Sequence, residues 1–335
     1  MARLFVVPAV IVSLLLAVAV VVVLFGSTTL EKQSSIGDLL AILESDTGER
    51  TAGIMLLPKA KDVWQASQEI ARRLQEKDKF LTPSEIQPTT ERIIAILDRY
   101  GVGRDVEEPA PAQQYFLMMA LAELESADAV GALVKRLDDP NWWTRRTALQ
   151  ALAQMHDVDE AQAALPSVIR SLNDRRPAIQ VVACGAVACL AEVGDAAAVR
   201  ALSGRLEAEL EVQWNAAMAL ARLGSRSGKL MLLNMLDRSY WEGLELDYLE
   251  NGMEVHRKYT ELEVARNLSA AIEAAACLED SDLAASVGAL LDDPAHDVRE
   301  AARVASKKDR SAGTLAGVDL EMARAADEFV DREKS

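Results

Sequence analysis

The side chains best suited to catalysis or metal binding are few and scattered in this sequence. Its three histidines, His156, His256 and His296, lie far apart along the chain, and none belongs to a His-Glu-x-x-His zinc motif. His256, with Asp247 and Glu254 close by in sequence, is the only cluster whose residue types would suit a metal ion. We expect no metal site, no cofactor and no catalytic residue, and predict that the protein is not an enzyme.

Cysteines and acidic pairs give equally little sign of chemistry. Cys184, Cys189 and Cys277 have neither the paired spacing of a zinc site nor the even count of a disulfide framework, so we expect small, buried apolar residues. The pairs Asp138-Asp139 and Asp292-Asp293 could hold a cation. Each pair precedes a predicted helix, however, where a side-chain oxygen accepts from the first backbone N–H groups, and we expect this capping role.

Aromatic side chains gather in one stretch of the chain. Residues 238–261 hold four of its fifteen aromatic residues, Tyr240, Trp241, Tyr248 and Tyr259. Tyrosine and tryptophan are enriched among the residues that dominate the energy of protein–protein binding. We therefore predict these four as partner-binding residues. The alternative is that the stretch only packs against its own domain.

The same stretch carries a strong signal for a β-hairpin. Asn251-Gly252 is a dipeptide that favours a two-residue hairpin turn. The pairs predicted by counting outward from this turn are Tyr248 with Val255, Leu246 with Arg257, Leu244 with Tyr259, Glu245 with Lys258 and Asp247 with His256. Opposite charges then face each other, as cross-strand stabilisation requires. Since a lone hairpin is marginal in water, we expect one face to pack on helices or on a partner.

The elements that must position these residues are helices. Half of the residues are hydrophobic but only 4% are aromatic, which favours closely packed helices rich in Ala, Leu and Val. A pattern of small residues recurs as Leu117, Ala120 and Leu121; Ala148, Ala151 and Leu152; Ala183, Ala186 and Val187; Ala216, Ala219 and Leu220; Ala271, Ala274 and Ala275; Ala302 and Ala305. The longer spacing from Ala216 to Ala271 leaves room for the aromatic stretch as an insertion. Six blocks over 107–308 thus predict an all-α solenoid of stacked helix pairs.

The turns of this pattern resemble those of a known family. DDPNWWTRRTALQAL (138–152) and DDPAHDVREAARVA (292–305) are similar to the D-x-x-x-V-R-x-x-A-x-x-A pattern of the HEAT-repeat family, including its short variety in phycobilisome-lyase-type proteins. Arg145 and Arg299 match the arginine of the pattern, whereas Gln180 and Gln213 do not. We expect the middle units to lack whatever that arginine contacts at the turn. The resemblance implies a scaffold or adaptor.

Trp142 and Trp143 follow the turn at Pro140 and begin a predicted helix. We expect at least one of them in the core, and either could serve as a binding anchor.

The ends of the chain differ from the repeats. Leu4 to Phe25 form a run without charges, which at about 1.5 Å per residue is long enough to cross a bilayer. We predict a transmembrane helix within an anchor over 1–30, and a single-pass membrane protein with its C-terminal domain on the periplasmic side. Residues 31–106 are predicted as a membrane-proximal helical region or degenerate repeat, and 309–335 as a C-terminal capping helix or tail.

The charge of the chain limits its partners. The net charge is −16, and because Arg3 is the only charged residue before Glu31, the part from Glu31 onward carries −17. Such a chain repels phosphate groups, so we do not expect it to bind nucleic acid. We predict a membrane-anchored scaffold that binds a protein partner. The alternatives are a chromophore-lyase-like enzyme, which the resemblance permits, and a structural protein whose repeats self-associate.

Overall fold

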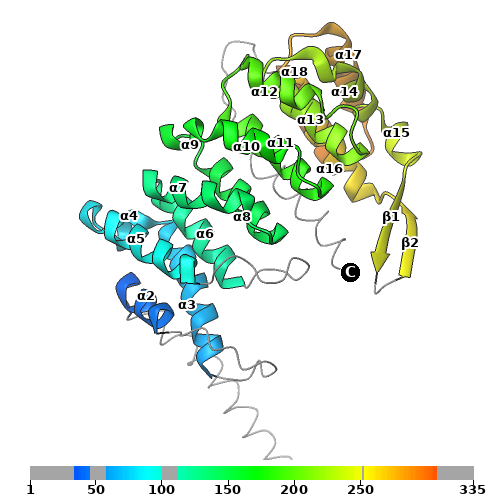
Figure 1. Ribbon diagram of the computed structural model, residues 1–335. Helices are drawn as coiled ribbons and strands as arrows, with labels where there is room; N and C mark the ends of the chain where they lie inside the picture. The colour runs from blue at the N-terminus through cyan, green and yellow to red at the C-terminus, as the bar shows by residue number, and fades with distance from the viewer. Residues whose placement is uncertain (1–33, 46–57, 100–111, 251–252, 308–335) are drawn as a thin grey trace, which may run out of the picture. The chain divides into compact units, whose positions relative to one another are not determined.

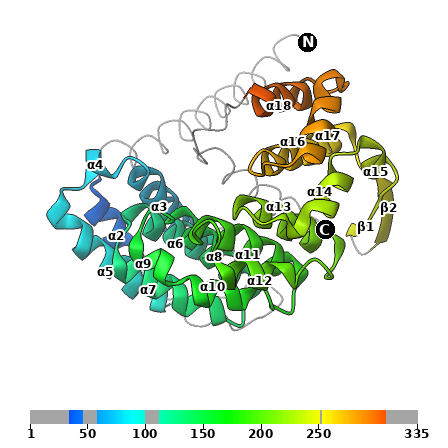
Figure 2. The ribbon, with the colours of Figure 1, turned by 90° about the horizontal axis from the view of Figure 1, so that it is seen from above.

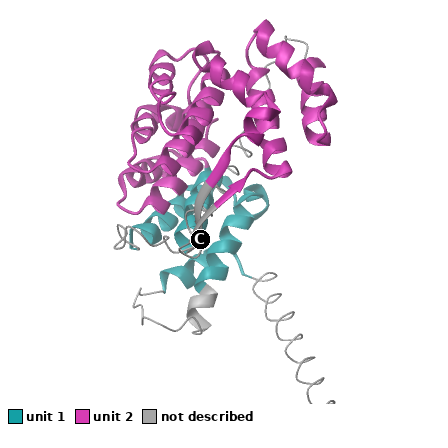
Figure 3. Ribbon diagram, turned by 90° about the vertical axis from the view of Figure 1, so that its right-hand side faces the viewer, with its two compact units in different colours: residues 1–100, 111–124 teal, residues 101–110, 125–335 magenta. Residues whose placement is uncertain are grey.

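The computed structural model describes residues 34–45, 58–99, 112–250 and 253–307. The chain divides into unit 1, residues 1–100 and 111–124, and unit 2, residues 101–110 and 125–335 (Figure 3). Apart from one hairpin, the regular elements described are helices, so the predicted helical class is confirmed (Figure 1). The predicted limits of the four regions of the chain stay predictions.

Unit 1 contains fewer of the described helices than unit 2. They are α2 (Ile36–Glu44), α3 (Pro58–Leu74), α4 (Lys77–Phe80), α5 (Pro83–Arg99) and α6 (Ala112–Leu124). Ser35 starts α2 with a capping box, because its Oγ accepts from Asp38 N while Asp38 Oδ2 accepts from Ser35 N. α3 packs along both α2 and α6, and the core between the helices holds fully buried residues such as Leu40, Ile70 and Ile93.

Unit 2 contains two rows of helices (Figure 2). The main row, in which each helix packs on the next, consists of α8 (Trp142–Gln154), α11 (Pro177–Leu190), α13 (Leu210–Arg222), α16 (Glu261–Ala275) and α18 (His296–Lys307). The second row consists of α7 (Ala127–Lys135), α9 (Asp159–Ala163), α10 (Leu165–Ser171), α12 (Ala196–Ser203), α14 (Lys229–Met235) and α17 (Ser281–Ala289). Short 3-10 turns lie at η1 (Arg136–Asp138), η2 (Arg226–Gly228) and η3 (Leu290–Asp292).

Small residues allow the helices of unit 2 to approach one another closely. The first alanine of each repeat block in the main row is fully buried: Ala148, Ala183, Ala216, Ala271 and Ala302. Gly228 of η2 lies so close to α13 that an added Cβ would stand 2.7 Å from the Cα of Ala217. The stacking of helix pairs predicted from the alanine pattern is therefore confirmed in this unit.

The insertion lies between α14 and α16. It comprises α15 (Arg238–Glu242), β1 (Glu245–Glu250) and β2 (Met253–Lys258). The strands are antiparallel and pair Leu246 with Arg257 and Tyr248 with Val255, which confirms the predicted register. Figure 1 shows the two strands leaving the helices as an arm near α15.

The predicted membrane anchor requires a correction. The predicted span, residues 4–25, lies outside the described residues, as does the predicted tail at 309–335. Among the residues that are described, none of the helices combines the length and the apolar character needed to cross a bilayer. α3 and α5, with 17 residues each, are too short at about 1.5 Å per residue and carry several charges. For this part of the chain, the prediction of a single-pass protein with a periplasmic domain is wrong.

Candidate functional site

Three aspartates hold equivalent places in the turns that precede main-row helices. Oδ1 of Asp139, Asp174 and Asp293 accepts from the backbone N–H two residues further on, at 2.8, 2.9 and 2.9 Å respectively. Each side chain thereby shapes a turn. The expected N-cap role of the acidic pairs is wrong for α8, because its N-cap is Asn141, whose Oδ1 accepts two backbone N–H groups of the first helical turn.

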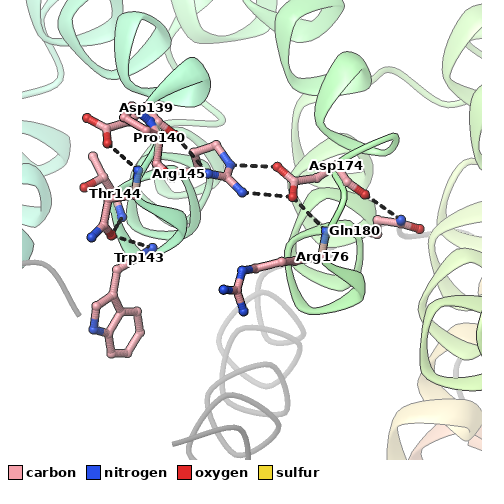
Figure 4. A network of polar contacts seen from close by, with 9 residues as sticks. Asp139, Pro140, Trp143, Thr144, Arg145, Asp174, Arg176 and Gln180 are labelled. Carbon is pink, nitrogen blue, oxygen red and sulfur yellow. Dashed lines mark hydrogen bonds and ion pairs between the residues drawn. The ribbon is translucent and has the colours of Figure 1, made fainter. Parts of the chain in front are cut away.

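Arg145 joins two of these turns (Figure 4). Its Nη1 donates to the carbonyl oxygens of Asp139 and Pro140, at 2.9 and 3.1 Å. Its Nε and Nη2 donate to the two carboxylate oxygens of Asp174, at 2.7 and 3.0 Å. The side chains of Arg145 and Asp174 are 9% and 10% exposed, so water screens the pair little. The pair links α8 to the turn before α11.

Glutamine replaces this arginine in the middle units and keeps its contact with the turn. Nε2 of Gln180 donates to Asp174 O, and Nε2 of Gln213 donates to Ala208 O, both at 2.7 Å. Arg299 makes the corresponding contact with the turn before α18. The expectation that the middle units lack the turn contact is therefore wrong. One amide donor suffices for a carbonyl, whereas a guanidinium has enough donors to hold a carboxylate as well.

Two of the predicted partner-binding residues belong to the core of unit 2. Trp241 is fully buried, and its Nε1 donates to Met235 O at 2.8 Å. Tyr240 is half-buried, and its hydroxyl oxygen accepts from Nε1 of Trp214 at 2.9 Å. The hairpin was predicted in this stretch without a helix before it, but Arg238–Glu242 form a short helix capped by Asp237, which turns Trp241 inward.

The other two residues lie on the hairpin side of the insertion. Tyr259 packs edge-on against Trp214 and Trp241, with ring centroids 6.3 and 5.7 Å apart. The side chain of Tyr248 lies outside what the structure describes. The structure thus brings Tyr240, Trp241 and Tyr259 together with Trp214 in one aromatic cluster, and the partner-binding role of the insertion stays a prediction.

The tryptophans after Pro140 form a second aromatic group. Trp142 is buried in the core, and its ring stacks on Trp143 with centroids 5.0 Å apart. Arg176 lies over Trp142 at 5.2 Å, and Arg146 lies over Trp143 at 4.8 Å. The cations add attraction to the ring faces, so this group serves packing between neighbouring helix pairs.

The described side chains that could bind a metal ion or act as thiol nucleophiles are not gathered into one site. Within the described ranges, no three His, Cys, Asp or Glu side chains are placed to hold a metal ion. Cys184 is fully buried, and burial raises the pKa of its thiol to about 12. That thiol stays protonated near neutral pH and is unreactive.

Sequence reasoning missed an aromatic surface on unit 1, made of Trp64, Tyr115 and Phe116. Trp64 of α3 and Tyr115 of α6 are 40% and 42% exposed. Each contacts Phe116 edge to face, with ring centroids 6.1 and 5.5 Å apart. The signal was present in the sequence of α6, which has apolar residues on all sides of the helix and so presents more apolar surface than one packed face can cover.

Comparisons with known proteins identify repeats but no activity. Residues 106–183 match a family model described as HEAT repeats. Among solved structures, the chain is similar to the complex of CpcE and CpcF of phycocyanin lyase from Nostoc sp. PCC7120, at 18% identity over 82% of this chain and 94% of that chain, with a TM-score of 0.43. It is also similar to an engineered protein, at 18% identity over 86% and 97% of the two chains, with a TM-score of 0.37. No curated protein matches significantly.

Proposed function

We propose that this protein is a HEAT-repeat scaffold or adaptor that binds a protein partner through its helical surface and catalyses no reaction. The observation that carries the proposal is the aromatic surface of unit 1, where Trp64 and Tyr115 stay two-fifths exposed although both contact Phe116. Joined, exposed aromatic side chains are typical of interaction surfaces, and tryptophan and tyrosine dominate their binding energy.

The use of polar groups in unit 2 supports the same proposal. Arg145, Asp174 and Gln180 bind turn carbonyls, turn N–H groups or one another. Groups engaged in this way hold helix pairs together, and a reaction at them would require the repeat contacts to break. The aromatic residues of the insertion that the structure describes also serve packing.

The partner we propose has an apolar segment with basic residues beside it. An apolar segment would bury Trp64 and Tyr115, which supplies the affinity. Because the part of the chain from Glu31 onward carries a charge of −17, basic flanks would speed association and strengthen it at low salt. Tyr248 on the hairpin, which the sequence predicted as a partner-binding residue, is the second candidate contact.

The test compares matched variants of the full chain in cross-linking capture from the native source, followed by affinity measurement with the identified partner. The surface variant is Trp64→Ser with Tyr115→Ser. The control is Val193→Ser with Leu230→Ser, two apolar residues of unit 2 that are 70% and 78% exposed. We expect the surface variant to lose at least about 30-fold in affinity, since aromatic hot spots contribute about 2 kcal/mol or more. The control should bind normally.

Two results would contradict this proposal. If the surface variant still binds the partner and Tyr248→Ser does not, the binding site lies on the hairpin and not on unit 1. Chemical turnover of a small molecule by the pure chain would favour the lyase-like alternative over a scaffold. Unchanged helical circular dichroism in every variant is the control for folding.

A further inference from the structure

The seam between α16 and α18 lacks a repeat arginine of its own. Counting from the repeat alanines, Ala148 in α8 and Ala271 in α16, the place of Arg145 falls on Leu268. Leu268 is fully buried and has no polar group to offer. The turn before α18 nevertheless contains Asp293, whose side chain is only 2% exposed. A carboxylate buried to this degree needs a cationic or hydrogen-bonding partner.

Arg238 of α15 provides that partner from outside the repeat pattern. Its Nε and Nη2 donate to the two carboxylate oxygens of Asp293, at 2.9 and 2.7 Å. The same two nitrogens of Arg145 hold Asp174, at 2.7 and 3.0 Å. The third donor of Arg238, Nη1, reaches Glu261 in the first turn of α16 at 2.8 Å. One guanidinium thus joins the first turn of α16 to the turn before α18.

The rest of the insertion is fixed to the core of unit 2 and to the start of α16. Trp241 is fully buried three residues after Arg238. Arg257 on β2 donates through Nη1 and Nη2 to the two carboxylate oxygens of Glu263 in α16, both at 2.7 Å. Glu263 also closes the capping box of α16 with Thr260. Both ends of the insertion therefore meet the start of α16, and Arg238 extends the connection to the turn before α18.

We propose that α15, with the described strands β1 and β2 attached to it, is a latch that holds α18 against α16, because Arg238 supplies the arginine that the repeat lacks. Displacing α15 withdraws Arg238 from Asp293 and frees α18. By thermodynamic linkage, loosening the turn before α18 must loosen α15 to the same extent. A partner that moves the hairpin arm would thus act on the last helix pair.

Hydrogen exchange on the full-length chain tests the latch. Arg238→Gln should speed amide exchange in α18 and α15 by about tenfold or more, because a charge-assisted pair is lost, while α8 and α11 keep wild-type rates. The matched control is Arg226→Gln, at an arginine that is 61% exposed, lies 3.7 Å from the N-cap Asp280 of α17 and donates to Glu279 O. It should leave α18 and α15 unchanged.

The reciprocal substitution separates a latch from a purely local contact. Asp293→Asn, on the far side of the seam, should speed exchange in α15 as well as in α18. Arg238→Lys keeps the charge but loses the two-pronged geometry, and should fall between wild type and Arg238→Gln; it also serves if the glutamine variant does not fold. Wild-type exchange in α18 for both Arg238 variants, or equal acceleration in all main-row helices, would overturn the proposal.

Discussion

Two seams of the main row are closed by the same pair of groups from different sources. Between α8 and α11, Arg145 of the repeat itself binds Asp174 of the next turn. Between α16 and α18, Arg238 of the insertion binds Asp293 in the same two-pronged way. The same contact is therefore made in both seams, although the arginine comes from different positions relative to the repeat. A buried turn aspartate needs a guanidinium, and the chain can supply it from any segment that lies close enough.

The largest effect is expected at Trp241 and tests whether α15, which carries Arg238, is anchored in the core of unit 2. Trp241→Ala should lower the free energy of unfolding by about 3–5 kcal/mol, because it leaves a cavity among Trp214, Tyr240 and Tyr259. Leu230→Ala, at a residue 78% exposed, should change it by less than about 0.5 kcal/mol. Urea unfolding followed by circular dichroism measures both. If the two variants lower the stability equally, α15 is not anchored in the core and cannot hold Arg238 at the seam between α16 and α18.

The next effect compares the two arginines directly. Arg145→Gln and Arg238→Gln should each cost about 2–4 kcal/mol, because each leaves a buried carboxylate without its cation. Glutamine is the matched replacement, because the amide of Gln180 binds a turn carbonyl in the same way as Arg145 does in its own unit. Thermal and urea unfolding would report the costs. A loss at Arg145 with none at Arg238 would break the equivalence of the seams.

A smaller loss of stability is expected where a side chain contacts only its own turn and no carboxylate of the next turn. Gln213→Ala removes one hydrogen bond to Ala208 O and should cost about 1 kcal/mol, well below the loss expected at Arg145. The difference between these two costs estimates what the guanidinium adds by reaching the next turn. Urea midpoints at constant slope give the comparison. A cost at Gln213 as large as at Arg145 would show that the turn contact alone closes a seam.

The smallest expected effect is on the pH dependence of stability, and it appears only in acid. Burial by itself raises the pKa of Asp293, but hydrogen bonds from Arg238 and from Ala295 N outweigh it and hold the pKa below its usual 3.8. A carboxyl whose pKa is lowered on folding contributes stability at higher pH, and that stability is lost as pH falls through 3.8 and toward the lowered value. Asp293→Asn should therefore flatten the acid limb of stability below about pH 4. An unchanged acid limb in this variant would mean that Asp293 is not held by Arg238 in solution.

Local patterns in the sequence predicted a large share of the fold. Buried alanines such as Ala183 and Ala216 marked the helices that stack, because only small residues suit close helix packing. Asn251-Gly252 and the alternation of charges predicted the hairpin register, since pairing in a hairpin follows from the turn alone. The HEAT resemblance identified Arg145 as the repeat arginine.

Contacts between residues far apart in sequence were beyond that reasoning. Arg238 lies outside the repeat period and 55 residues before Asp293, so no spacing connects the two. Trp241 was expected at a binding surface, but a short capped helix turns it into the core. The aromatic surface of unit 1 depends on which sides of α3 and α6 are covered, and Trp64 is separated from Tyr115 by a length of chain that no motif spans.

The most direct test of the equivalence of the two seams is a pair of double-mutant cycles for unfolding. One cycle combines Arg145→Gln with Asp174→Asn, and the other combines Arg238→Gln with Asp293→Asn. We predict coupling energies of about 1.5–3 kcal/mol in both, equal within a factor of about two, because both are charge-assisted pairs of the same geometry. A coupling near zero for Arg238 and Asp293, with a normal value for Arg145 and Asp174, would contradict the claim that the insertion closes the last seam.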